Sequence, residues 1–248
     1  MQHFLYLVAA GLVAGSMNAV AGGGSFVTFP TLVLVGLPPI AANATSTVAL
    51  CPGTLASTWA YRRELTGIGG ISLRVLLPIG LAGGLSGAIL LLITPGGLFD
   101  KVIPWLLLLA TLTFLGGRRP GIWLRHYVCI GRPALLAAQF VISVYGGYFG
   151  GAVGLMMLAV WTLLETADLQ AMAAARTLLV STANASAVLC FILAGAVWWP
   201  EALAMMASAV AGGYYGARFA RHLPPPVLRA FVVTLSAAVT AGFFVRAY

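Results

Sequence analysis

The sequence predicts an all-α polytopic membrane protein made of two inverted repeats of about five helical segments, each with a short broken or re-entrant helix. The 248-residue chain is 61% hydrophobic and only 7% charged, whereas soluble domains carry about 25% charged residues. Its apolar runs cover the whole length rather than forming one anchor. A glycine break in the first run, at residues 22–24, returns in altered form at residues 146–154.

Apolar runs between turn signals give five expected helices in each half. They cover residues 4–20, 24–36, 40–61, 72–93 and 98–115, then 133–149, 153–165, 171–195, 199–218 and 227–246. The third, fourth and fifth of each half are near or above the ~20 residues that cross a bilayer. The second, with about 13 residues, covers about 20 Å and is too short for ~30 Å of hydrocarbon. The sequence leaves open whether it crosses fully or folds back as a hairpin.

The two halves match at a fixed offset of 129 residues, which indicates an internal repeat. The matching positions are Gly83, Gly84, Gly87, Pro95, Leu106, Thr111 and Phe114 in the first half and Gly212, Gly213, Gly216, Pro224, Leu235, Thr240 and Phe243 in the second. We therefore divide the chain into a first transmembrane repeat (residues 1–116), a linker (117–132) and a second transmembrane repeat (133–248).

The basic residues predict the orientation. Positively charged loops stay in the cytoplasm, and a cytoplasmic linker places all thirteen basic residues inside except Lys101, Arg176 and Arg246. The first repeat then begins outside and the second inside, so the repeats are inverted. The net charge of +8 is thus explained by topology, and we expect no nucleic-acid partner. The lipid bilayer is the expected surrounding, and the sequence allows a homodimer without deciding it.

The first glycine break is a candidate anion site. Backbone N–H groups freed at the start of a short helix, together with the helix dipole, suit an anion. The break consists of Gly22, Gly23, Gly24 and Ser25, and Asn18 can add an amide donor from one turn earlier. Close helix packing is the other interpretation of such glycines, but three in succession exceed what packing needs. The second break adds Gly151 and Gly154.

Polar residues at the start of the third segment of each half extend this candidate site. In the first half they are Asn43, Thr45 and Ser46. Hydroxyls in membrane helices often bond to the carbonyl four residues earlier, whereas Asn is harder to satisfy in this way. In the second half the corresponding region contains Arg176 and Thr177.

Arg176 lies in an apolar segment, where an uncompensated charge costs about 2.5–3.5 kcal/mol at the helix centre. It either reaches the cytoplasmic surface or pairs with Glu165 or Asp168, or it faces a cavity and supplies charge for an anion. Asn184, eight residues later and near the same helical face, is another candidate amide.

Other chemistries find little support in the sequence. The five acidic and three histidine residues lie near segment ends or in loops, and the three cysteines lack metal or redox spacing. A carboxylate-based cation site, a metal site and an intramembrane serine hydrolase are therefore not expected. No Walker A pattern occurs, so neither ATP hydrolysis nor a cofactor is expected.

The sequence resembles the sulfite exporter TauE/SafE family over essentially its whole length. The resemblance rests on residues 18–25 (Asn-Ala-Val-Ala-Gly-Gly-Gly-Ser), 29–32 (Phe-Pro-Thr-Leu), 42–47 (Ala-Asn-Ala-Thr-Ser-Thr) and 223–229 (Leu-Pro-Pro-Pro-Val-Leu-Arg). In the second half, Ala152-Val153-Gly154 stands where the family often has a glycine triplet, and Val160 replaces the following proline.

The resemblance implies export of a small sulfur-containing oxyanion, such as sulfite, sulfoacetate or another sulfonate, across a bacterial inner membrane by alternating access. It implies no enzymatic activity. Two alternatives stay open. One is a proton- or sodium-coupled transporter of another small anion, and the other is an intramembrane enzyme or an assembly subunit without transport activity.

Overall fold

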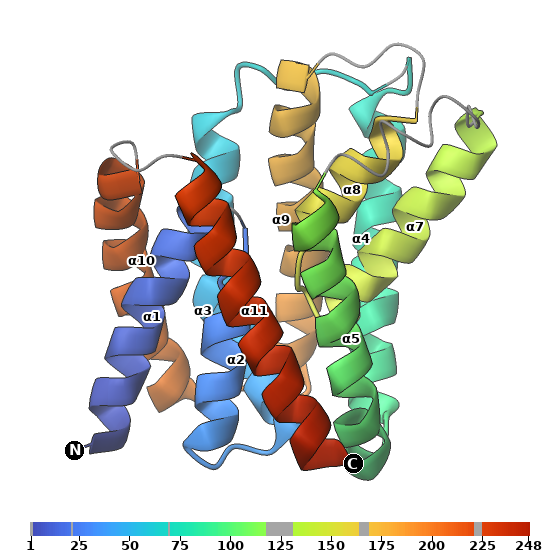
Figure 1. Cartoon of the computed structure of the whole chain (residues 1–248). Coiled ribbons are helices and arrows are strands. Elements are labelled where there is room, and N and C mark those ends of the chain that lie inside the picture. Colours follow the sequence, from blue (N-terminus) through green and yellow to red (C-terminus); the bar gives the residue numbers. More distant parts are fainter. Residues whose placement is uncertain (1, 21, 69, 118–130, 164–168, 221–224) are drawn as a thin grey trace.

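The computed structural model describes residues 2–20, 22–68, 70–117, 131–163, 169–220 and 225–248, and it confirms the all-α polytopic class (Figure 1). The expected helices correspond one by one to those observed, with ends that differ by a few residues. The helices are α1 (Gln2–Val20), α2 (Ser25–Leu34), α3 (Pro39–Ala60), α4 (Leu73–Ile93), α5 (Gly96–Gly116), α7 (Arg132–Tyr148), α8 (Val153–Trp161), α9 (Leu169–Leu193), α10 (Trp199–Ala220) and α11 (Pro225–Ala247).

Several helix starts follow from local sequence. Pro39 is the first residue of α3, where its missing N–H leaves no hydrogen bond unmade. Ser72 caps α4 by accepting a hydrogen bond from the backbone N–H of Arg74 at 3.2 Å, which satisfies one of the orphan donors of the first turn.

Four stretches among the described residues are long and apolar enough to cross a membrane: Leu73–Ile93, Gly96–Gly116, Ala174–Leu193 and Ala230–Ala247.

The two short helices fold back as hairpins, which settles the question that the sequence left open. His3 and Tyr6 near the start of α1 line the same groove as Leu34 and Val35 at the end of α2, so both outer ends lie at one end of the molecule. In the second half, Nε2 of Gln139 in the middle of α7 contacts Sδ of Met157 in α8 at 3.8 Å, so α8 runs back along α7. In Figure 1, α2 lies in the lower half of the molecule and α8 in the upper half.

The helices pack in equivalent pairs in the two halves, so that interchanging the halves gives the same set of contacts. α1 packs along α10 and α4 packs along α7, while α3 packs on α9 and α5 on α11. Small residues permit the closest approaches: a Cβ on Gly83 would lie 2.5 Å from the Cβ of Ser143 in α7, and one on Gly212 would overlap the backbone of Leu12 in α1. In Figure 1, α1 runs upward whereas α7 runs downward, as expected of inverted repeats.

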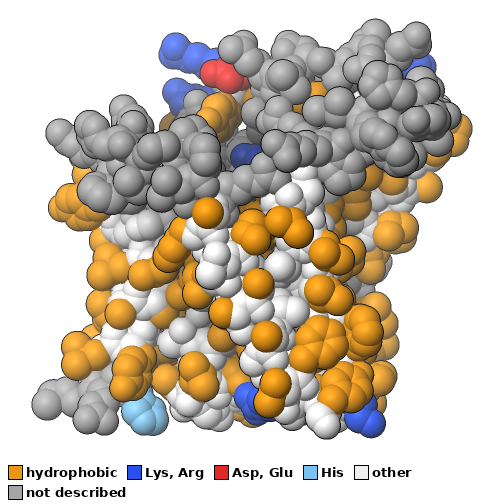
Figure 2. All heavy atoms as spheres, in the orientation of Figure 1, with side chains coloured by type: hydrophobic (Ala, Val, Ile, Leu, Met, Phe, Trp, Pro, Cys, Tyr) orange, Lys and Arg blue, Asp and Glu red, His pale blue; other side chains and the backbone are white. Residues whose placement is uncertain are grey.

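Most of the charged side chains seen in Figure 2 lie at the two ends of the molecule, with a largely apolar belt between them. Arg62, Arg63 and Arg74 are exposed around the end of α3 and the start of α4. Arg132 joins them, because its guanidinium lies 3.0 Å from the place of a Cβ on Gly70 in the α3–α4 loop. An apolar belt between polar ends is the surface of a multi-pass membrane protein.

Candidate functional site

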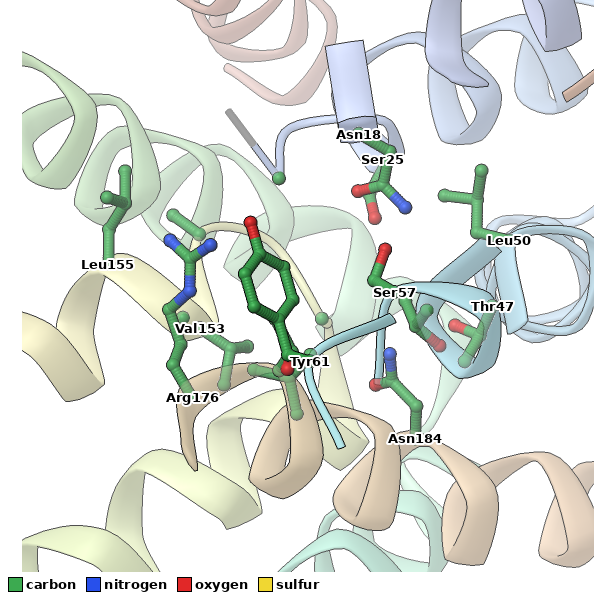
Figure 3. A pocket seen from close by; sticks show the side chains of 17 residues that line it. Asn18, Ser25, Thr47, Leu50, Ser57, Tyr61, Val153, Leu155, Arg176 and Asn184 are labelled. Carbon is green, nitrogen blue, oxygen red and sulfur yellow. The ribbon is translucent and has the colours of Figure 1, made fainter. Parts of the chain in front are cut away.

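A cavity of about 130 Å³ lies where the tips of the two hairpins meet. The end of α1, the two chain breaks and the first residues of α2 and α8 form one part of its wall, and one face each of α3 and α9 forms the rest (Figure 3). We call it the anion cavity, after the kind of ligand that the sequence predicts for these residues. Its lining residues are Asn18, Gly22, Ser25, Thr47, Leu50, Thr54, Ser57, Tyr61, Gly150, Ala152, Val153, Gly154, Leu155, Arg176, Thr177, Val180 and Asn184.

The two chain breaks are equivalent in the structure. Gly22 has φ +77° and precedes the first residue of α2 by three positions, and Gly150 has φ +83° and precedes the first residue of α8 by three. Positive φ is readily adopted only by glycine. The second break differs at Ala152, a non-glycine residue with φ +59°. Gly150, Gly151 and Ala152 thus occupy the place of the first glycine triplet, rather than residues 152–154.

Arg176 reaches the anion cavity from α9. Its aliphatic stem lies over Gly154, where a Cβ would come within 2.9 Å of the Arg176 Cδ, so this glycine makes room for the arginine. The side chain lines the cavity wall, which is the position that the second interpretation of the sequence requires. Glu165 and Asp168, the alternative partners, lie outside the described residues.

Two amides also face the anion cavity. Asn18, at the end of α1, and Asn184, on α9, project toward it from different directions (Figure 3). Neither side chain hydrogen-bonds to a described residue, nor does Ser25 beside the first break. These three side chains can therefore donate to a ligand without first giving up a protein partner.

Hydroxyl groups complete the polar lining. Thr47 donates to the carbonyl of Asn43 at 2.9 Å, Ser57 to that of Gly53 at 2.9 Å, and Thr177 to that of Ala174 at 2.8 Å. Their protons point along the helices, as is usual for hydroxyls in membrane helices. Among the described lining residues Arg176 carries a positive charge and none is acidic.

Three predicted site residues near the start of α3 lie away from the anion cavity. Each is buried and forms a hydrogen bond to a different part of the chain. Asn43 Nδ2 donates to the carbonyl of Tyr148, at the end of α7, at 2.9 Å. The hydroxyl of Thr45 accepts from the backbone N–H of Trp198 at 3.1 Å. The hydroxyl of Ser46 bonds to that of Thr28 in α2.

Three predicted glycines are likewise absent from the lining. Gly23 and Gly24 are buried behind the first break, where a Cβ on Gly24 would lie 2.9 Å from the carbonyl oxygen of Ala14. A Cβ on Gly151 would lie 2.8 Å from the ring of Phe149. These glycines permit close packing beneath the site. The predicted residues that the structure brings together in the lining are Asn18, Gly22, Ser25, Gly154, Arg176, Thr177 and Asn184.

Sequence reasoning missed the face that α3 contributes. Its lining residues are Thr47, Leu50, Thr54, Ser57 and Tyr61, with steps of three and four residues. Such steps mark one face of an α-helix. A polar stripe at this spacing through an apolar segment is the signal that could have found them.

The sequence profile of the sulfite exporter TauE/SafE family matches residues 7–243 of this chain. The chain belongs to the TauE/SafE family. Within the anion cavity, the glycine element that carried the resemblance contributes Gly22 and Ser25, and the following polar element contributes Thr47.

Relatives of this TauE/SafE protein are named as transporters. YfcA of Escherichia coli K12, a "probable membrane transporter protein", is 29% identical over 96% of this chain and 87% of its own length. A protein of Haemophilus influenzae with the same description is 31% identical over 95% and 92%, and ORF9 of a Sinorhizobium species is 30% identical over 96% and 91%. No solved structure matches significantly. The chain is therefore a membrane transporter of the TauE/SafE family.

Proposed function

We propose that this protein exports a small sulfur-containing oxyanion, such as sulfite, sulfoacetate or another sulfonate, by alternating access through the anion cavity. The observation that carries the proposal is the position of Arg176. It lines a cavity at the start of two short helices, beside two amides and several hydroxyls, with no acidic residue among the described lining.

Size and charge support an anion of a few heavy atoms. The volume of about 130 Å³ is several times what one water molecule needs but below the roughly 300–1,000 Å³ of drug-sized sites. Helix N-termini contribute positive potential and N–H donors. A planar guanidinium matches an oxyanion through paired hydrogen bonds.

The membrane potential gives export its driving force. With the cytoplasm negative, each negative charge that moves outward gains about 2.3 kcal/mol per 100 mV. An anion exporter therefore needs no buried carboxylate to couple its movement to protons. In this proposal the end that carries Arg62, Arg63 and Arg132 faces the cytoplasm of a bacterial inner membrane, as the positive-inside rule favours.

Counterflow in liposomes that contain the purified protein tests the proposal. We expect labelled sulfite or sulfoacetate to exchange. Chloride should compete poorly because it has no oxygen atoms to accept hydrogen bonds, and zwitterionic taurine because it has no net negative charge. An imposed inside-negative potential should speed outward flux. A requirement for a proton or sodium gradient would favour the coupled alternative, and no anion exchange at all would contradict the proposal.

A further inference from the structure

A second cavity, of about 530 Å³, adjoins the anion cavity on the side of α1 and α10. We call it the α3–α10 cavity. Its wall is mostly apolar and includes Pro52, Gly53 and Ala56 of α3, and Gly213 and Tyr214 of α10. The two cavities share the lining residues Asn18, Leu50, Ser57 and Tyr61. Whatever occupies one therefore lies against side chains that also face the other.

The α3–α10 cavity lies in the half of the molecule nearer to Arg62 and Arg63. Its residues come from the second half of α3, which ends at Ala60 just before these arginines, and from the second half of α10. Below it the helices are joined, because the hydroxyl of Thr45 in α3 accepts from the N–H of Trp198 directly before α10. The two helices are thus fastened at one end and separated by the cavity toward the other.

The equivalent contact in the other half of the protein is closed. Gly84 of α4 and Gly213 of α10 are repeat counterparts, at the offset of 129. A Cβ on Gly84 would overlap the carbonyl oxygen of Ala183, so α4 and α9 touch through their backbones. A Cβ on Gly213 would meet only the carbonyl oxygen of Gly15 in α1, at 3.6 Å, and no described atom of α3 within 4 Å.

The neighbouring glycines show that this asymmetry is local. Gly83 and Gly212 are also counterparts, and both are tightly packed against the long helix of a hairpin, Gly83 on α7 and Gly212 on α1. The hairpins therefore sit alike in both halves. The difference lies in the contact between the fourth helix of one half and the third helix of the other, which is closed at Gly84 (α4 on α9) and open at Gly213 (α10 and α3).

α3 has a bending point in the wall of this cavity. Pro52 lies inside the helix and has no N–H to donate to the carbonyl of Val48, which weakens the helix at that turn. Gly53 follows it and is exposed, so no side chain packs there to hold the bend. Beyond this point α3 carries Thr54, Ser57 and Tyr61 along the anion cavity.

We propose that the α3–α10 cavity is the entrance through which the anion reaches Arg176, and that it closes when α3 bends at Pro52–Gly53 and packs on Gly213. The inference rests on the proposed function. Exchange of the two conformations between inverted repeats is the general route from one access state to the other. In the opposite state the contact between α9 and Gly84 is open, and the contact between α3 and Gly213 is closed.

The substitution Gly213→Leu tests closure. The new side chain projects into open space, so the present state should fold and keep its anion-dependent thermal shift with sulfite, while closure is blocked. We expect transport to fall at least tenfold. Gly242→Leu is the matched control, because nothing described lies within 4 Å of a Cβ there, and it should transport normally. Transport by Gly213→Leu within twofold of wild type would overturn the proposal.

A cross-link tests the movement without any substrate. In a chain whose three native cysteines are replaced, Ala56→Cys and Gly213→Cys place thiols on opposite walls of the α3–α10 cavity. A disulfide requires Cβ atoms about 3.5–4.5 Å apart, so it should form only after closure. We expect oxidative cross-linking, slowed severalfold by adding Pro52→Ala, which restores the helical hydrogen bond. Absence of cross-linking would overturn the closure, whereas cross-linking without anion transport by wild type would refute only the proposed function.

Discussion

The hydroxyls of Thr111 and Thr240 are hydrogen-bonded to each other at 3.0 Å, and the two residues are the same position in the two repeats. A residue that touches its own counterpart lies on the axis relating the halves. Because the hydroxyl of Thr240 donates to the carbonyl of Ser236 at 2.7 Å, Thr111 is the donor between the two. The contact therefore marks the centre of the α5–α11 interface.

The direction of the hydrogen bond from Thr111 to Thr240 predicts that substitutions of the two residues have unequal effects on stability. Thr240→Val removes the acceptor and leaves the Thr111 proton facing a methyl group, whereas Thr111→Val leaves only an unused lone pair. Hydrogen bonds between membrane helices are worth about 0.6 kcal/mol on average and up to about 1.7. We expect Thr240→Val to cost more stability than Thr111→Val, and the double variant to cost less than the sum. Thermal unfolding in detergent measures this, and strict additivity would contradict the pairing.

Arg176→Ala should abolish most anion binding, because it removes the positive charge of the described cavity wall. Arg176→Lys keeps the charge but loses the planar pair of donors, so we expect intermediate affinity. Arg74→Ala, at the exposed start of α4, is the control for a loss of net charge. Isothermal titration with sulfite measures these affinities. Equal affinity in Arg176→Ala and Arg74→Ala would exclude a direct role for Arg176.

The three asparagines should separate into two classes. Asn43→Ala removes the buried hydrogen bond to the Tyr148 carbonyl, and an unsatisfied buried group costs about 1–3 kcal/mol, so we expect a lower melting temperature. Asn18→Ala and Asn184→Ala should leave melting unchanged and weaken anion binding about tenfold, since hydrogen bonds to charged groups are worth about 1.5–3 kcal/mol. The reverse pattern would move the site toward Asn43.

The two chain breaks should respond oppositely to exchange of glycine and alanine. Gly22→Ala places a Cβ in open space, so its cost is the left-handed conformation alone, about 1–2 kcal/mol. Ala152→Gly relieves the same strain, offset by about 0.4–1 kcal/mol of added freedom in the unfolded chain. We expect Ala152→Gly to stabilise by between zero and about 1.6 kcal/mol in thermal unfolding. Destabilisation by Ala152→Gly would show that its methyl group packs usefully.

The sequence predicted the helices well because apolar length and turn residues are local signals. The hairpin direction was not predictable, since a segment of about 13 residues fits either path and only its contact with α1 decides. The orientations of Asn43, Thr45 and Ser46 were also hidden: neighbours on a helix point about 100° apart, so polar residues at positions 43 and 45–47 point to several sides of α3 and do not mark one face. The stripe from Thr47 to Tyr61 was readable by its spacing and marks the face that lines the anion cavity.

The packing of α1 against α10 sets the order of assembly during synthesis. Ser16 bonds to the carbonyl of Gly212, 196 residues later in the chain, and Gly15 lies against the backbone of Ala209. At about 5–20 residues per second, a ribosome needs about 10–40 s to make that interval. The glycine face of α1 therefore meets α10 only after most of the chain has been made, and until then lipid or the insertion machinery must cover that face.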